Sequence, residues 1–195
     1  MELNTFIQTY DWPQAVVLLE GKRKVLAADA PKLVELGALL ARHTKHILFR
    51  SGNADGSDYL FSKGVVSVHP LRLQVITPYT GHRQKTNLAY DSISLDDIDM
   101  AAEELIYQTK SNMRVSNLVD QYVAGERTHF SIKAAYLLRD TVKVIGTDTL
   151  SPASFGIFYD DLKKPKTGGT GHTMQVCDNK SIPRINQQVW FDWLQ

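Results

Sequence analysis

The sequence has a single cysteine, no long apolar run and almost no excess of charge of either sign. Cys177 is the only cysteine in 195 residues, so no disulfide can form within the chain, as is typical of proteins from a reducing compartment. No apolar run approaches the roughly 20 residues that span a bilayer. Met1–Tyr10 lacks the basic and apolar segments of a signal peptide. We therefore expect a cytoplasmic protein without a membrane partner.

The charge balance is close to neutral, with 22 Lys and Arg against 21 Asp and Glu and a formal net charge of +1. Such a chain creates no strong overall field that would draw it to nucleic acid, although a local basic patch remains possible. Apolar residues make up 43% of the sequence, and no internal repeat is evident. The length suits one domain with a sizeable core, so we predict a single domain over residues 1–195.

Short apolar segments alternate with helical patterns along most of the chain. This rhythm is typical of βαβ units around a parallel sheet. We expect a Rossmann-like α/β fold, a parallel sheet flanked by helices. The predicted strands are Ala15–Leu19, Ile47–Phe49, Leu71–Thr77, Val142–Ile145, Phe155–Tyr159 and Ile182–Ile185, and the predicted helices include Asp29–His43, Asp58–Lys63 and Ser131–Arg139.

A helical insertion of about residues 81–130 is predicted between the third and fourth of these strands. Ser94-Leu95-Asp96-Asp97 has the pattern of a capped helix start. An apolar stripe follows at Ile98, Ala101, Ala102, Leu105 and Ile106, and a second helix is expected over Val115–Val123. Each helix is too short to enclose a core alone, so we expect an extended crossover rather than a second domain.

Three glycine-containing loops follow predicted strands: Gly21–Arg23, Ser51–Asp58 and Gly168–His172. Because ligands bind at the carboxyl ends of strands in open α/β sheets, these loops predict a nucleotide-sized anion site. The alternative is that each loop is simply a tight turn. The sequence contains neither G-x-x-x-x-G-K-[ST] nor G-x-G-x-x-G, which argues against an ATPase or a dinucleotide dehydrogenase.

The segments VVLLEGKR, RSGNADGSD, ITPYTGHR, LLRDTVKVIG and GGTGHTMQVCDNKSIP occur in an order that resembles the SLOG superfamily. That superfamily includes the DNA-processing protein A domain and the LOG "lysine decarboxylase-like" phosphoribohydrolases. The resemblance implies a Rossmann-like fold, a homo-oligomer and a nucleotide-type ligand between the loops, with no further cofactor. The ligand-binding positions it implies are Gly21, Arg23, Ser51, Gly52, Ala54, Gly56, Asp58, Gly168, Gly169, Thr170, Gly171 and His172, and Arg139-Asp140 resembles a family Arg-Asn or Arg-Asp pair.

The LOG motif P-G-G-x-G-T-x-x-E departs from this chain at its catalytic glutamate, where Gln175 stands. A glutamine supplies no carboxylate, so N-glycosidic cleavage by the LOG mechanism is in doubt. The catalytic residues stay open, with Asp58, Arg139 and His172 as candidates. The resemblance also leaves single-stranded DNA binding as an alternative. His172 either donates a hydrogen bond to a phosphate or acts as a general acid, or it only caps the following helix.

Two further features are a pair of histidines and a basic segment. His43 and His46 are close in sequence, but no adjacent Cys, Asp or Glu completes a metal ligand set, so no metal site is predicted. The basic segment Lys163–Lys166 precedes the last glycine loop and is either a flap over a phosphate or a solvated loop.

Overall fold

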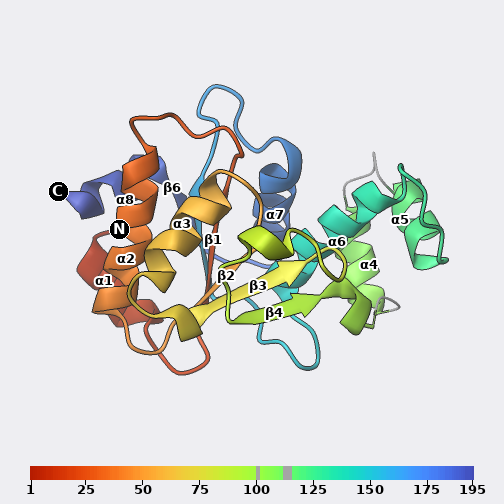
Figure 1. The fold of residues 1–195 in the computed structure, drawn as a ribbon, viewed down its shortest axis with the longest axis horizontal. Coiled ribbons are helices and arrows are strands. Elements are labelled where there is room, and N and C mark those ends of the chain that lie inside the picture. Colours follow the sequence, from red (N-terminus) through yellow and green to blue (C-terminus); the bar gives the residue numbers. More distant parts are fainter. Residues whose placement is uncertain (100–101, 112–115) are drawn as a thin grey trace.

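The computed structural model describes residues 1–99, 102–111 and 116–195. At its centre lies a six-stranded parallel sheet with the strand order β4-β3-β2-β1-β5-β6 (Figure 1). The strands are β1 Val16–Gly21, β2 Leu48–Ser51, β3 Leu73–Thr77, β4 Asp91–Ser94, β5 Phe155–Tyr159 and β6 Arg184–Asn186. The predicted fold class, a Rossmann-like α/β sheet with flanking helices, is confirmed.

Helices cover both faces of the sheet (Figure 1). They are α1 Leu3–Tyr10, α2 Ala30–His43, α3 Ser57–Val66, α4 Glu103–Lys110, α5 Ser116–Val123, α6 Ile132–Ile145, α7 Gly168–Asn179 and α8 Gln187–Trp190. Because side chains alternate along a strand, β1 contributes to both layers. Val17 and Leu19 belong to the core under α1, α2, α3 and α8, and Leu18 packs with the buried side chains of α7. All six residues of β1 are buried, as its continuous apolar run predicts.

The strand order reverses beside β1. The chain first lays down β1, β2, β3 and β4 in one direction, and then returns to place β5 and β6 on the other side of β1. Gly21, the last residue of β1, is paired with Tyr159, the last residue of β5. In open parallel sheets, ligand crevices form outside the carboxyl ends of the strands at such a reversal. The topology therefore predicts a ligand site at the carboxyl ends of β1 and β5.

The predicted strand Val142–Ile145 is wrong, because these residues form the last turn of α6. Their β-branched side chains favour a strand, but the apolar positions of α6 continue through Val142 at helical spacing and pack on other helices. The fourth strand is instead β4, a short edge strand with the polar sequence Asp-Ser-Ile-Ser. The helices of the predicted insertion therefore follow the fourth strand, and β4 itself lies within residues 81–130.

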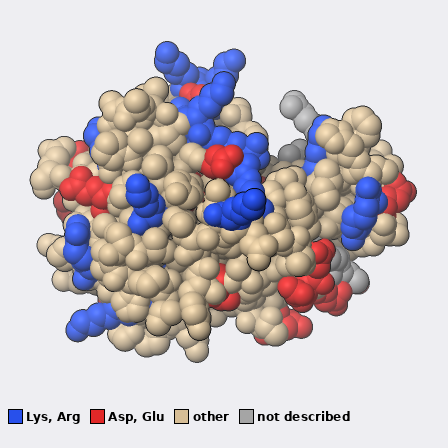
Figure 2. Space-filling view, in the orientation of Figure 1, with Lys and Arg blue, Asp and Glu red and all other residues tan. Residues whose placement is uncertain are grey.

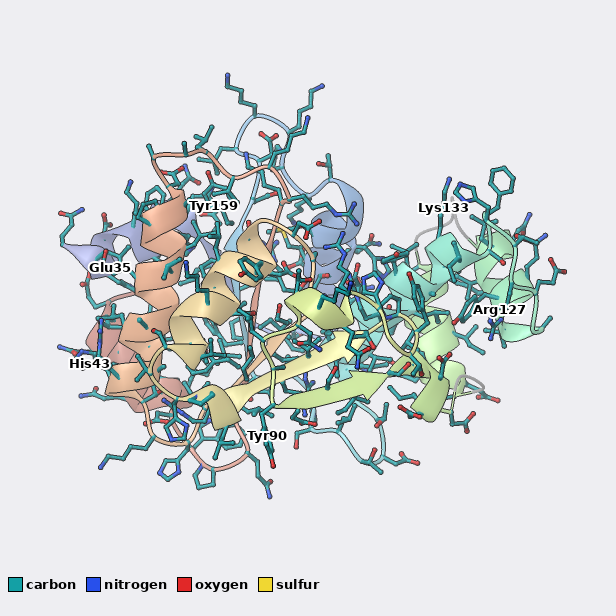
Figure 3. The ribbon with its side chains drawn as sticks, in the orientation of Figure 1. Glu35, His43, Tyr90, Arg127, Lys133 and Tyr159 are labelled. Carbon is teal, nitrogen blue, oxygen red and sulfur yellow. The ribbon has the colours of Figure 1, made fainter. Side chains whose placement is uncertain are left out.

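The predicted insertion helices form a projection on one side of the molecule, where α4 and α5 pack on α6 (Figure 1; Lys133 and Arg127 mark it in Figure 3). Ser94 accepts a hydrogen bond from the Asp96 N–H, but the turn that it caps is a 3₁₀ helix, and α4 begins only at Glu103. The predicted stripe residue Ala101 and the predicted helix start Val115 lie outside the described residues. No helix in the described ranges is long and apolar enough to cross a bilayer.

Candidate functional site

A cavity of about 390 Å³ opens at the carboxyl ends of β1 and β5, where the strand order reverses. Its wall comes from the loop after β1, the loop before α3, the middle of α6 and the start of α7. The lining residues are Glu20, Gly21, Lys22, Arg23, Ala54, Asp58, Tyr136, Leu137, Arg139, Asp140, Lys143, Thr167, Gly168, Gly169 and Thr170. The three predicted loops, which are far apart in the sequence, thus meet at one cavity.

The predicted site residues divide into two groups. Those on the cavity wall are Gly21, Arg23, Ala54, Asp58, Arg139, Gly168, Gly169 and Thr170. Those outside the wall are Ser51, Gly52, Gly56, Gly171 and His172, all buried except for Gly56, which is half-buried. Their role in ligand binding stays a prediction for both groups, but only the first group faces the cavity.

Close packing between loops explains two of the glycines outside the wall. Gly56 has a φ of +83°, and a Cβ there would lie 2.1 Å from the carbonyl oxygen of Arg23. A Cβ on Gly171 would lie 2.1 Å from the carbonyl oxygen of Lys166. In both places only glycine lets two backbone segments approach this closely. These glycines therefore shape the loops rather than contact a ligand.

The Asp58 carboxylate ties the first two loops together. It lies in the first turn of α3 and is 3% exposed. Its Oδ1 accepts the Gly21 N–H at 3.2 Å, and its Oδ2 accepts the Gly52 N–H at 3.2 Å and the Ala54 N–H at 3.4 Å. Burial raises the pKa of Asp58, although Lys143 and Arg139 oppose that rise. Asp58 is thus an organiser of the loop backbone as well as part of the cavity wall.

A buried ion cluster forms the floor of the cavity. Lys143 Nζ lies 2.7 Å from Glu20 Oε1 and 2.8 Å from Asp140 Oδ1. Arg139 donates from Nη2 to Asp140 Oδ1 at 2.7 Å and from Nη1 to the Gly52 carbonyl at 2.7 Å. The spacing of Arg139, Asp140 and Lys143 places all three on neighbouring positions of α6, facing the end of β1. Charges this far from water are stable only when paired.

The two carboxylates paired with Lys143 differ in protonation. Burial raises the pKa of Glu20 to about 7; Lys143 opposes the rise, and the nearby carboxylates of Asp58 and Asp140 add to it. Burial alone would also raise the pKa of Asp140, but Arg139 and Lys143 together lower it below its usual value. Near neutral pH, Asp140 is therefore ionised, whereas Glu20 is present in both its protonated and its ionised form.

The rim of the cavity is positively charged. Figure 2 shows Lys and Arg side chains gathered over the loops that follow β1 and β5, at the top of the view. Lys22 and Arg23 line the cavity, and Arg23 is exposed and makes no hydrogen bond or ion pair with the described residues. Of the predicted basic flap, Lys166 is already engaged, because its Nζ lies 2.9 Å from Asp178.

The N-terminus of α7 opens into this cavity. Gly168, Gly169 and Thr170 form its first turn, and their backbone N–H groups donate no hydrogen bond to any described residue. The side chain of Thr167, at the N-cap position, does not cap the helix. Free N–H groups and the helix dipole together favour an anion. The first turn of α7 is therefore suited to a negatively charged group, and Arg23 lines the same cavity.

The loop after β3 also lies beside the site, although the three-loop prediction omitted it. Arg83 forms an ion pair with Asp55 at 2.9 Å, which joins this loop to the one before α3. The His82 ring packs edge-on against Tyr136, with ring centroids 5.6 Å apart. Burial and, after it, the positive charges of Arg139 and Arg83 together lower the pKa of His82 to about 4, so His82 is neutral at physiological pH.

His172 lies behind the cavity, in the packing between helices. Its Nε2 lies 3.0 Å from Thr141 Oγ1, which also accepts a hydrogen bond from Thr109 Oγ1 at 2.8 Å. The ring is 2% exposed, burial lowers its pKa, and its Nδ1 has no partner among the described residues. It does not reach the cavity and does not cap α7, so both predicted roles lack support. Cys177 is buried in the core, where burial raises its pKa to about 12.

Sequence reasoning missed Glu20 and Lys143. Glu20 follows the apolar run of β1 directly, and a carboxylate at the end of a buried strand signals a site. Lys143 follows Arg139 by four residues, a spacing that becomes informative once 142–145 is assigned to a helix. The described residues contain no group of three His, Cys, Asp or Glu side chains arranged for a metal ion.

No protein-family model matches the chain, and no curated protein has a sequence similar enough to count as a relative. One solved structure resembles it, DNA processing protein A from Helicobacter pylori, which is described as having a unique single-stranded DNA binding mode. The match covers 92% of this chain and 67% of the other, with 15% sequence identity and a TM-score of 0.48. These values are too low to transfer an activity.

Proposed function

We propose that this protein binds a nucleotide or a nucleotide-derived ligand in the cavity between β1, β5 and α7. The observation that carries the proposal is the open N-terminus of α7, whose free N–H groups line the same cavity as Arg23 and Lys22. The volume of about 390 Å³ suits a ligand of mononucleotide size. The order of the loop motifs, which resembles the SLOG superfamily, supports the same assignment.

The proposal is tested by isothermal titration calorimetry with nucleoside 5′-monophosphates, nucleoside 5′-diphosphates and ADP-ribose. We expect Arg23→Ala to weaken binding of the best ligand by roughly 1.5–3 kcal/mol, because a guanidinium–phosphate hydrogen bond is charge-assisted. Lys24→Ala is the matched control, since Lys24 is exposed on the same loop but does not line the cavity. Equal affinity in both variants would place the ligand elsewhere.

A second candidate is cleavage of an N-glycosidic bond, which two of the three carboxylates on the cavity wall favour. Gln175 is not part of that wall, but Glu20 and Asp58 are, and the pKa of Glu20, about 7, suits proton exchange. The test is incubation with nucleoside 5′-monophosphates followed by chromatography for free base. Release of base by the wild type and not by Glu20→Gln would support it. Binding of single-stranded DNA and homo-oligomer formation stay predictions.

A further inference from the structure

Glu20 connects the floor of the cavity to the helix that begins beside it. Its side chain is 3% exposed and lines the cavity. Lys143 Nζ lies 2.7 Å from Oε1, and the hydroxyl of Thr173 donates to Oε2 at 3.1 Å. Thr173 belongs to α7, and its hydroxyl also lies 3.2 Å from the carbonyl oxygen of Gly169 in the first turn. A single side chain therefore joins Glu20 to the turn where an anion is proposed to bind.

The buried part of the cavity wall contains more carboxylates than cations. Glu20, Asp58 and Asp140 are its carboxylates, and Lys143 and Arg139 are the only cations among the buried lining residues that the structure describes. Three carboxylates against two cations leave one negative charge when all five groups are ionised. A buried net charge is costly, and an anion placed beside it adds repulsion. Protonation of one carboxylate removes both penalties.

Glu20 is the carboxylate that takes up this proton most easily. Asp140 lies between Arg139 and Lys143, which together lower its pKa. Asp58 accepts the N–H groups of three loop residues, and such hydrogen bonds favour the ionised form of a carboxylate. Glu20 accepts no backbone N–H from the described residues, and burial raises its pKa to about 7. The surplus negative charge of the wall is therefore assigned to Glu20.

The other groups around Glu20 do not titrate near neutral pH. Arg50 stays charged, since its pKa is about 10, and it is offset by Asp91. Burial raises the pKa of Cys177 to about 12 and lowers that of His172. Listed by element, the surrounding groups are Arg50 of β2, Asp58 of α3, Arg139, Asp140 and Lys143 of α6, and His172 and Cys177 of α7, whereas β5 places the uncharged Phe158 opposite Glu20.

We propose that binding of an anion in the cavity is coupled to uptake of a proton by Glu20, so that the site holds anions more tightly as the pH falls. This inference rests on the proposed function and concerns the regulation of the same site. A bound anion repels the ionised form of Glu20 and does not repel the neutral form. By linkage, protonation of Glu20 and binding of the anion therefore favour each other.

The direction of the pH dependence follows from the form of Glu20 that each state prefers. Well below pH 7, Glu20 is protonated before the anion arrives, and binding is tightest. As the pH rises through 7, binding must draw a proton from solution or accept a charged neighbour, so the affinity falls. If the anion raises the pKa of Glu20 by about one unit, the affinity is about 5- to 10-fold higher at pH 6 than at pH 8.5.

The test is isothermal titration calorimetry with ADP-ribose at pH 6 and pH 8.5. ADP-ribose is the probe because its phosphoryl groups carry no proton that titrates near neutral pH. Titrations at pH 7.5 in HEPES and in Tris, which differ in ionisation enthalpy, measure proton uptake directly, and we expect about half a proton per bound ligand. Equal affinity at both pH values without proton uptake overturns the inference and leaves the proposed function standing.

Glu20→Gln is the decisive variant, because it keeps the size of the side chain and removes its titration. We expect it to bind ADP-ribose with the same affinity at pH 6 and pH 8.5, with circular dichroism to confirm that it is folded. Glu104→Gln is the matched control, since Glu104 also pairs with a lysine, Lys180 at 2.8 Å, but is exposed and does not line the cavity. It should keep the full pH dependence. A dependence that survives in Glu20→Gln overturns the assignment to Glu20.

Nucleoside 5′-monophosphates serve as the second set of probes if ADP-ribose does not bind. Their phosphate itself titrates, so the quantity compared is the difference in proton uptake between the wild type and Glu20→Gln. A difference of zero overturns the inference. Binding of none of these probes at either pH overturns the proposed function, and the inference with it.

Discussion

Replacing Lys143 with methionine should destabilise the fold strongly and in a pH-dependent way. Lys143 is 1% exposed and lies 2.7 Å from Glu20 and 2.8 Å from Asp140. Methionine keeps the length and the apolar stem of the side chain but removes the charge. Asp140 would still pair with Arg139, so the carboxylate left without a cation is Glu20.

The magnitude follows from the burial of that carboxylate. Removing one partner of a buried ion pair costs about 3–5 kcal/mol, a large share of the roughly 5–15 kcal/mol by which domains are stable. The pKa of Glu20 is about 7 even with Lys143 present, and loss of the nearby positive charge would raise it further. The cost is therefore larger at pH 8, where Glu20 must either ionise without a cation or hold a proton that the unfolded chain releases, and smaller at pH 6, where Glu20 is protonated with or without Lys143.

The assay is urea unfolding followed by circular dichroism at pH 6 and pH 8. Lys180→Met is the matched control, because Lys180 pairs with Glu104 at 2.8 Å but is 38% exposed, so its loss should cost less than about 1 kcal/mol. The double variant Glu20→Gln with Lys143→Met should recover part of the stability at pH 8, since no uncompensated charge remains. Losses of the same size for Lys143→Met and Lys180→Met would show that the cluster is not shielded from water.

Three further predictions concern the residues around the cavity. The raised pKa of Glu20 stabilises the fold below about pH 4.5, and this contribution is lost as the pH rises through 7. In urea titrations, the wild type should therefore lose roughly 3 kcal/mol of stability relative to Glu20→Gln between pH 4.5 and pH 8. Gly171→Val should destabilise the fold by about 1–3 kcal/mol in thermal unfolding, because the valine Cβ would clash with the backbone of Lys166. Unchanged stability would contradict the close packing of these two segments. Tyr159→Phe removes the hydrogen bond that the Tyr159 hydroxyl donates to Asp29 Oδ2 at 2.7 Å (Tyr159 is labelled in Figure 3). The loss should cost about 1 kcal/mol of stability and speed tryptic cleavage in the loop after β1. Cleavage at the wild-type rate would contradict the idea that this hydrogen bond holds the loop.

The local sequence pattern was sufficient to predict the strand at the centre of the sheet. The apolar run Ala15–Leu19 predicts a buried strand because a strand covered on both faces needs no polar positions, and β1 is such a strand. The loops after it are also local features, since glycine and a helix start can be recognised within a few residues. The order of these elements along the chain was enough to predict a parallel α/β sheet.

Tertiary contacts decided the elements with weak local patterns. Val142–Ile145 has the composition of a strand, but packing of α6 on α4 and α5 keeps it helical. The edge strand β4 is short and polar, and only its pairing with β3 makes it a strand. In both places the deciding interactions come from residues distant in the sequence, so a window of neighbouring residues does not contain them.

The candidate site depends on tertiary structure more than any strand does. The sequence by itself determined which loops carry glycines and where basic residues flank them. Only the fold decided that Glu20, Asp58 and Lys143 would meet and that Gly56 and Gly171 would serve loop packing. It also decided that His172 would contact Thr141 and not line the cavity. The physical reason is that the charge of a side chain can be read from its identity, whereas its burial, its partners and hence its pKa depend on atoms brought together from the whole chain.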